Sequence, residues 1–197
     1  MDYINAGFKN VWNLTENQNL ILSRTLDNGN LWLGNVTAAL DLNFLVDNNI
    51  EVIINCSPDI PFIDEILDPE HLCKQNKNYC RLNNLDKFRI PVFDSLLPHD
   101  IYKMEQYLPL VLPFILQKLL KEKKNVLVHC HGGIQRSACV ISALLYVLKD
   151  CENSHSGKSE CMKNIITYIR KCRPRVFRFG YSINFKKSLE NYFNIKF

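Results

Sequence analysis

The sequence lacks the features that mark membrane-inserted and secreted chains. It contains no run of about 18 uncharged apolar residues, the length that a membrane-spanning helix requires. Its opening segment, MDYINAGFKNVW, lacks the apolar core of a signal peptide. These absences predict no membrane span and a location in the cytoplasm or nucleus. If the chain is viral, the virion and the host-cell cytoplasm are the corresponding locations.

A large charge excess and a paired cysteine framework are also absent. The formal net charge of +4 is too small to predict nucleic-acid binding by itself. The eight cysteines show no paired spacing and several lie in apolar runs, so reduced thiols are expected. Cys73 and Cys80, with His71 nearby, match no usual zinc spacing. The sequence therefore predicts no metal and no cofactor.

The composition that is present suits one well-buried domain. The chain has 197 residues, of which 47% are hydrophobic and 22% are charged. Helical and β-branched segments alternate without internal repeats. This order predicts an α/β fold, a single domain with a central, mostly parallel, twisted sheet flanked by helices. Residues 1–30 are predicted to be an N-terminal extension with a helix and a hairpin arm, serving packing or a homodimer contact, and residues 31–197 the main domain.

Apolar periodicity places the individual elements. The predicted strands cover residues 31–34, 50–56, 88–93 and 125–128. The predicted helices cover about 37–47, 100–122, 137–149, 161–172 and 182–193. Pro109 and Pro113 are expected to bend or interrupt the second of these helices.

The most informative stretch is NVLVHCHGGIQRSACVISALLYVLK, residues 125–149. It predicts a buried strand, a glycine-containing loop from His129 to Arg136, and an apolar helix. Successive backbone N–H groups and the helix N-terminus then surround one concavity that suits an anion and favours the thiolate form of Cys130. Gly132 and Gly133 allow close backbone approach, and the Arg136 guanidinium matches phosphate oxygens. The pattern predicts a cysteine-dependent phosphatase.

The motif HCHGGIQRS resembles the signature loop of the protein tyrosine phosphatase superfamily, which reads His-Cys, five residues, Arg and then Ser or Thr. The WLGN, IEVIINCS and IPVFD segments resemble the small dual-specificity phosphatases, including their poxvirus members. The resemblance extends over roughly residues 30–193. It implies a protein tyrosine phosphatase-like fold, with residues 31–197 as the catalytic domain.

The resemblance assigns roles within the loop. Cys130 becomes the nucleophile that forms a phosphocysteine intermediate, and Arg136 holds the phosphoryl oxygens with the backbone N–H groups of residues 131–136. Ser137 would hydrogen-bond the departing thiolate, and His129 would brace the loop and help to keep Cys130 ionised. The implied substrate-binding residues are His131, Gly132, Gly133, Ile134, Gln135 and Arg136.

The resemblance also implies a general acid on a preceding loop. The IPVFD segment places Asp94 there, with Asp100 as the second candidate. Asp86 and Asp100 are otherwise expected to be structural. Cys56, at the end of a neighbouring strand, is expected to be a buried core thiol. The alternative is a protective disulfide with Cys130, which some family members form under oxidation.

Two departures from the family pattern concern substrate choice and the architecture behind the loop. The loop carries His131, Ile134 and Gln135 but no lysine, which disfavours polyphosphorylated lipids. The segment RPRVFRFGY lacks the Pro-Asn pair that the family tends to have near this position. Arg178 in that segment is expected to add a cation near the rim of the site.

Three functions follow in order of preference. The first is a protein phosphatase that acts on phosphotyrosine and also on phosphoserine and phosphothreonine. The alternative is an RNA 5′-triphosphatase-like phosphatase whose partner is an RNA 5′ end, favoured by the basic segment 170–178. The third is a non-catalytic phosphoprotein-binding module. It is disfavoured because the nucleophile, the arginine and the acid are all present.

Overall fold

The computed structural model describes residues 17–68, 71, 73–74, 77–95, 97–154, 157–178 and 184–197. Most of the predicted N-terminal extension, residues 1–16, lies outside the described residues, as does the start of the last predicted helix at residues 182–183.

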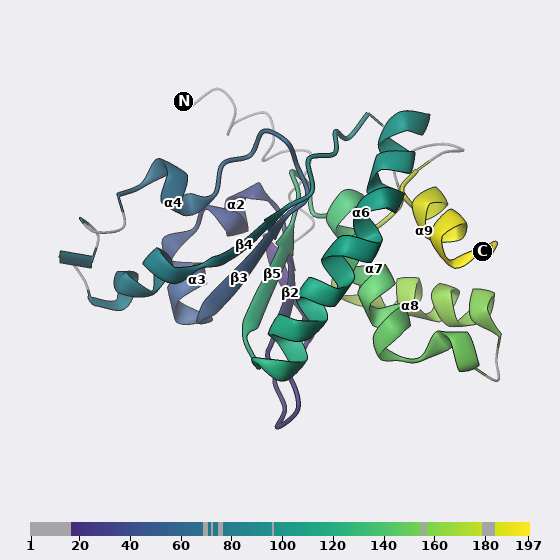
Figure 1. Ribbon diagram of the computed structural model, residues 1–197, viewed down its shortest axis with the longest axis horizontal. Helices are drawn as coiled ribbons and strands as arrows, with labels where there is room; N and C mark the ends of the chain where they lie inside the picture. Colours follow the sequence, from purple (N-terminus) through teal and green to yellow (C-terminus); the bar gives the residue numbers. More distant parts are fainter. Residues whose placement is uncertain are drawn as a thin grey trace.

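A five-stranded sheet forms the centre of the molecule (Figure 1). Its strands are β1 (Gln18–Leu22), β2 (Leu31–Gly34), β3 (Ile50–Asn55), β4 (Asp86–Arg89) and β5 (Asn125–His129). Their spatial order is β1-β2-β5-β3-β4. Only β1 runs antiparallel to its neighbour, and the other pairs are parallel. The predicted α/β fold with a mostly parallel sheet is confirmed. Strand β1, from the predicted N-terminal extension, pairs with β2 of the predicted main domain, so this part of the extension belongs to the sheet.

The central strand β5 is buried at every residue. Successive side chains of a strand point to opposite faces. Val126 and Val128 accordingly join one apolar core, whereas Leu127 joins the core on the other face. A strand covered on both faces needs a nearly continuous apolar run, and this is why the sequence pattern located it.

Helices cover the two faces of the sheet unequally (Figure 1). The larger core is covered by α6 (Pro98–Leu116), α7 (Arg136–Leu148), α8 (Lys158–Cys172) and α9 (Lys186–Phe193). The smaller core lies under α2 (Val36–Ala39), α3 (Leu42–Asp47), α4 (Ile63–Ile66) and the 3₁₀ segment η1 (Lys77–Asn84). A π-helical turn, η2 (Gln117–Lys121), continues α6, and a 3₁₀ turn, η3 (Cys151–Asn153), precedes α8.

The single helix predicted over residues 37–47 is instead two short helices. Asn35 caps α2 by accepting a hydrogen bond from the Ala38 N–H at 3.0 Å. Asp41 caps α3 in the same way, accepting from the Phe44 N–H at 3.1 Å. A carboxylate that caps a new first turn in the middle of an apolar run restarts the helix there.

The predicted interruption of the long helix by its prolines is wrong. Pro109 and Pro113 both lie inside α6, which continues to Leu116 before the π-helical turn. Each proline removes one backbone hydrogen bond. Both prolines are solvent-exposed, so water can reach the carbonyl groups that lose their donors.

Other boundaries differ by a few residues from the predicted ones. Strand β4 covers Asp86–Arg89 rather than 88–93, and Pro91, which lacks an N–H donor, follows it. Helix α8 begins at Lys158, three residues earlier than predicted, and α9 begins at Lys186.

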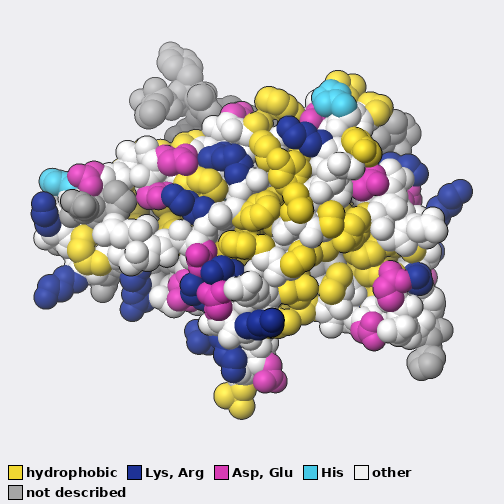
Figure 2. Space-filling model, in the orientation of Figure 1, with side chains coloured by type: hydrophobic (Ala, Val, Ile, Leu, Met, Phe, Trp, Pro, Cys, Tyr) yellow, Lys and Arg dark blue, Asp and Glu magenta, His cyan; other side chains and the backbone are white. Residues whose placement is uncertain are grey.

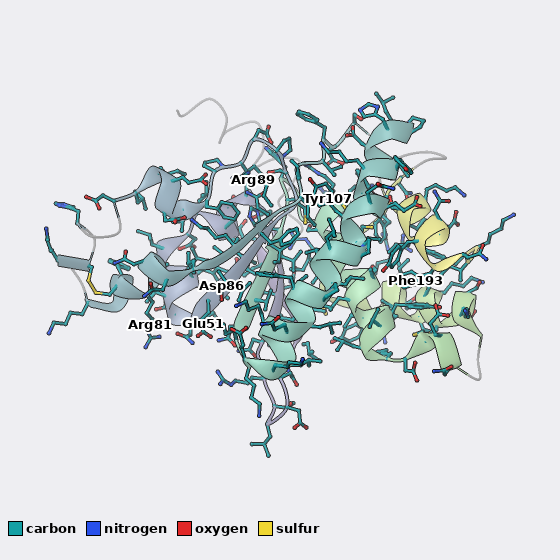
Figure 3. The ribbon with its side chains drawn as sticks, in the orientation of Figure 1. Glu51, Arg81, Asp86, Arg89, Tyr107 and Phe193 are labelled. Carbon is teal, nitrogen blue, oxygen red and sulfur yellow. A yellow bond between two sulfur atoms is a disulfide. The ribbon has the colours of Figure 1, made fainter. Side chains whose placement is uncertain are left out.

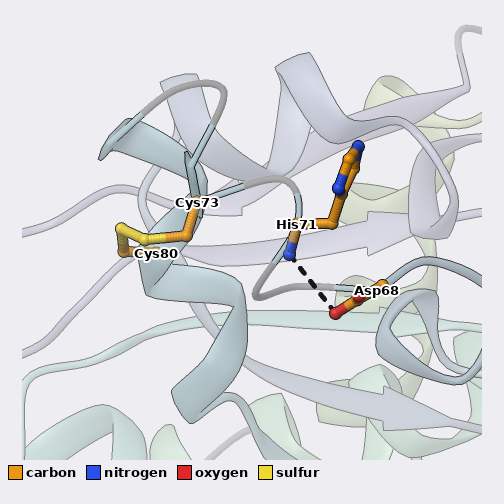
Figure 4. Close-up of a disulfide and its surroundings, with 4 residues drawn as sticks. All are labelled: Asp68, His71, Cys73 and Cys80. Carbon is orange, nitrogen blue, oxygen red and sulfur yellow. Dashed lines mark hydrogen bonds between the residues drawn. A yellow bond between two sulfur atoms is a disulfide. The ribbon is translucent and has the colours of Figure 1, made fainter.

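Four of the eight cysteines are paired, which corrects the expectation of reduced thiols. Disulfides join Cys73 to Cys80 (Figure 4) and Cys151 to Cys161. Cys56, Cys130, Cys139 and Cys172 are free. The pairs escaped the sequence analysis because the folded backbone, and not a recognisable spacing, brings each of them together.

The outer face of α6 is apolar (Figure 2). Tyr102 and Leu110 are exposed on it, and no charged residue occurs from Gln106 to Gln117. Exposed apolar surface of this kind is typical of contacts with other proteins. The homodimer stays a prediction. Within the described ranges, no helix is both long and apolar enough to cross a membrane.

Candidate active site

The predicted strand, loop and helix lie at the carboxyl edge of the parallel sheet. Cys130 follows β5 directly, and Arg136 is the first residue of α7. The segment that carries Asp94 follows β4, two strands away from β5 in the same sheet. Because the carboxyl ends of parallel strands share one edge, residues distant in sequence meet there.

The loop between β5 and α7 is held by its carbonyl groups. Three of its carbonyl oxygens accept hydrogen bonds from the surrounding scaffold. These bonds run from the Val36 N–H to His131, from Arg173 Nη2 to Gly132 and from the Phe177 N–H to Ile134, each with 3.1 Å between the heavy atoms. In a trans peptide the next N–H points opposite to the carbonyl. The N–H groups of residues 132, 133 and 135 are therefore directed into the loop.

One of these inward N–H groups contacts the predicted nucleophile. The Gly133 N–H donates to Cys130 Sγ at 3.2 Å, and Ser137 Oγ donates to the same sulfur at 3.1 Å. Cys130 itself is fully buried. Two converging donors on one sulfur would stabilise the negative charge that a thiolate nucleophile carries. The structure thus brings the predicted Cys130 and Ser137 into contact.

Gly133 is required by the geometry of the loop. Its φ of +66° lies in the left-handed region, where side chains are disfavoured. A Cβ atom there would lie 2.5 Å from the Gly34 carbonyl oxygen and 2.8 Å from Arg173 Nη2. Any side chain would displace both the strand end and the guanidinium that anchors the loop.

Arg136 and Asp94 form an ion pair at the site. Arg136 Nη2 lies 3.3 Å from Asp94 Oδ2, and Nη1 donates to the Val92 carbonyl oxygen at 2.9 Å. The Arg136 side chain is only 4% exposed, whereas that of Asp94 is 37% exposed. The predicted acid is therefore next to the arginine that is predicted to bind phosphate, and it is accessible to a ligand.

The two other candidate acids have different partners. Asp100 is buried at the start of α6, where it accepts a hydrogen bond from Ser95 Oγ and lies 3.3 Å from His99 Nε2. Asp86 lies in β4 and pairs with Lys118 and Lys124. Both arrangements match the structural roles predicted for these residues.

His129 is a neutral core residue. Complete burial, followed by the nearby cations Arg89 and Arg136, lowers the pKa of its imidazole to about 3. A neutral imidazole adds no positive charge beside Cys130, and the role of His129 in keeping Cys130 ionised stays a prediction. Its backbone does brace the site, because the His129 carbonyl accepts from the Cys56 N–H at 2.8 Å.

Cys56 is a buried thiol and is not bonded to Cys130. Burial raises the pKa of the Cys56 thiol well above its ordinary value, and the neighbouring Cys130 adds to this shift. The preferred expectation of a core thiol matches the structure, and both cysteines are free.

The basic segment 170–178 is not a continuous surface patch. Arg173 is fully buried and donates to Gly132 O and to Asn19 Oδ1, the latter at 2.7 Å. Arg170 Nε donates to the Val176 carbonyl oxygen at 2.8 Å. Two of the arginines that favoured RNA binding are thus used inside the protein. Arg178 is exposed, and its place at the rim stays a prediction.

A cavity of about 290 Å³ opens beside the loop. It is lined by Asp59, Phe93, Asp94, His131, Gly132, Ile134 and Arg136. Sequence reasoning missed Asp59 and Phe93 here, and it missed Arg173 behind the loop. Asp59 follows β3 at the same sheet edge, a signal that could have identified it. A buried arginine, in contrast, looks like a surface arginine in the sequence.

The His129 pKa predicts an acid-sensitive fold. In the unfolded chain the His129 imidazole has a pKa near its usual value of about 6.5. In the folded protein the same imidazole binds a proton only near pH 3. The free energy of unfolding should therefore fall by about 1.4 kcal/mol between pH 8 and about pH 5.5 from this group alone. Urea titrations of wild type and His129→Gln across this range measure the effect. The variant should lack this part of the slope, and identical slopes would contradict the assignment.

Comparisons with known proteins agree with this geometry. Residues 31–195 match the family described as "Dual specificity phosphatase, catalytic domain". The chain is 28% identical over 172 residues to the tyrosine-protein phosphatase vhp-1 of Caenorhabditis elegans, covering 87% of this chain but only 21% of that protein. It is 29% identical over 159 residues to the putative tyrosine-protein phosphatase AMV078 of Amsacta moorei entomopoxvirus, covering 81% of each.

The fold of this chain is similar to that of a solved phosphatase domain. The phosphatase domain of Yvh1 from Chaetomium thermophilum superposes with a TM-score of 0.65 at 19% identity, over 90% of this chain and 95% of that one. With a family match over most of its length, the chain belongs to the dual specificity phosphatases, a family of cysteine-dependent protein phosphatases, and contains their catalytic domain.

Proposed function

We propose that this chain hydrolyses phosphotyrosine, and also phosphoserine and phosphothreonine, in protein substrates through a phosphocysteine on Cys130. The observation that supports this most directly is the pair of donors on the buried sulfur, the Gly133 N–H and Ser137 Oγ. A thiolate that accepts from these two donors is positioned to attack a phosphorus atom bound in the loop.

In the first step, Cys130 Sγ attacks phosphorus and the bond from phosphorus to the substrate oxygen breaks. Arg136 and the inward N–H groups bind the other phosphoryl oxygens and stabilise the charge that develops on them. The phosphate binds the side of the Arg136 guanidinium that otherwise contacts Asp94, and thus displaces Asp94. Asp94, displaced from Arg136, takes up a proton from solvent and gives it to the leaving oxygen.

In the second step, water attacks the phosphocysteine and the S–P bond breaks. The Asp94 carboxylate accepts a proton from this water, and inorganic phosphate leaves. The proton that Asp94 regains in this step returns to solvent when Asp94 pairs with Arg136 again. Ser137 Oγ, 3.1 Å from the sulfur, stabilises the departing thiolate. The cycle ends with the enzyme in its starting protonation state, and it uses no metal.

The cavity wall supports phosphotyrosine as a substrate. Phe93 is 56% exposed, and it lines the cavity together with Ile134. Two apolar side chains beside a phosphate site suit the ring of a phosphotyrosine. RNA 5′ ends are a weaker candidate because Arg170 and Arg173 are bonded within the protein.

The chemistry also restricts where the enzyme can act. Cys130 must remain a free thiolate, and it is unpaired in this structure. A cytoplasmic or nuclear location, where thiols are kept reduced, suits this requirement, although the same conditions disfavour the two disulfides of this structure. The intact Cys130, Arg136 and Asp94 argue against a phosphoprotein-binding module without activity.

Replacing Cys130 tests the function directly. Cys130→Ser should lower turnover of an aryl phosphate by at least about a thousandfold, because a hydroxyl is not ionised at neutral pH. Wild type should keep its activity in EDTA, since no step uses a metal. The measurement is phosphate release under both conditions. Undiminished turnover by the variant, or loss of wild-type activity in EDTA, contradicts the mechanism.

The effect of Asp94→Asn on turnover should depend on the leaving group of the substrate. Turnover should fall by about a hundredfold for an alkyl phosphate, whose oxygen needs a proton in order to leave. An activated aryl phosphate, whose leaving group is stable as an anion, should lose much less. The comparison uses kcat for both substrates, with Asp100→Asn as the matched control. If kcat falls equally for both substrates in Asp94→Asn, a group other than Asp94 donates the proton to the leaving oxygen.

A further inference from the structure

Asp59 is a carboxylate at the catalytic cavity that the proposed chemistry does not use. It lies four residues beyond the end of β3 and lines the cavity with Phe93, Asp94 and Arg136. Its side chain is exposed. A bound phosphate would occupy Arg136, so Asp59 would face the part of the substrate outside the phosphoryl group.

The turn that carries Asp59 is fixed by a buried network. Asn55 Oδ1 accepts from the Ser57 N–H at 3.1 Å and from Ser57 Oγ at 2.7 Å. Asn55 Nδ2 donates to the Ile60 carbonyl oxygen at 2.7 Å, and Ser57 Oγ accepts from the Ile60 N–H at 3.2 Å. Asn55 and Ser57 are fully buried. The backbone on both sides of Asp59 is therefore held in one conformation.

Arg89 holds the same turn from the outside. Its Nη1 donates to the Ile60 carbonyl oxygen at 2.6 Å and to that of Ser57 at 3.2 Å. Its guanidinium lies 4.6 Å from the centre of the Phe62 ring, and Figure 3 shows Arg89 near the upper end of β4. Because the turn is already fixed, an exposed carboxylate on it can bind a ligand with little loss of backbone conformational entropy.

We infer that Asp59 is a specificity-determining residue that binds a lysine or arginine side chain next to the phosphorylated residue of the substrate. This inference rests on the proposed function. An ionised carboxylate only accepts hydrogen bonds, and a cation is its strongest partner. Asp94 places a second carboxyl group at the same cavity. A basic flanking residue is thus attracted, and an acidic one is repelled.

The experiment measures a ratio of rates. Two phosphotyrosyl peptides differ only in the residues beside the phosphotyrosine, which are lysine in one and glutamate in the other. We expect the ratio of kcat/KM for the lysine peptide to that for the glutamate peptide to fall about two- to fivefold in Asp59→Asn, the range of an exposed ion pair. It should fall further in Asp59→Lys. The effect should shrink in high salt, where charges are screened.

Asp27→Asn is the matched control. Asp27 is exposed in the turn between β1 and β2, beside the residues that precede β5, whereas the catalytic loop follows β5. The same charge is thus removed at the opposite end of the sheet. The rate ratio should equal that of wild type.

The outcomes separate the two proposals. If wild type hydrolyses both peptides and the rate ratio is the same in all four proteins, the role of Asp59 is overturned and the proposed function stands. A ratio that falls equally in Asp27→Asn also overturns the role, because net charge then explains it. If wild type hydrolyses neither peptide, the proposed function fails and the inference fails with it.

Discussion

The proposed chemistry depends on three carbonyl groups of the loop between β5 and α7, which point outward and accept hydrogen bonds from the surrounding scaffold. Hydrogen bonds to His131, Gly132 and Ile134 come from β2–α2, from the residue after α8 and from the segment beyond it. Planar trans peptides then direct the intervening N–H groups inward, and that of Gly133 donates to the sulfur of Cys130. The loop is therefore shaped by the scaffold, and Gly133 is required where the backbone of β2 comes closest.

Positive charge at the site comes from two arginines in different roles. Arg136 is at the cavity, where Asp94 contacts it in the absence of substrate. Arg173 is buried behind the loop and acts through the Gly132 carbonyl. His129 is kept neutral by its burial. The proposed catalysis can thus use a permanent cation and an exposed acid at the cavity, while a second, buried guanidinium anchors the loop from behind.

The sequence was sufficient for features set by local pattern. The apolar run of β5 predicted the central strand, and the His-Cys to Arg-Ser loop predicted that Cys130 and Ser137 meet at one site. IPVFD predicted the place of Asp94 beside Arg136. Features set by the folded chain were missed. Asp41 restarts a helix, Arg173 turns inward, and the paired cysteines meet only in three dimensions. Asp59 was missed because only its place after a strand of the same sheet relates it to a loop some 70 residues later.

The covalent intermediate is the most direct test of this account. In Ser137→Ala, breakdown of the phosphocysteine should slow, because the departing thiolate loses its hydroxyl donor. Mixing this variant with a phosphotyrosyl peptide, quenching in acid and mapping the digest by mass spectrometry should place one phosphoryl group on Cys130. The double variant Cys130→Ser, Ser137→Ala should carry none. Release of phosphate without a modified Cys130, or with the phosphoryl group on another residue, would contradict the account.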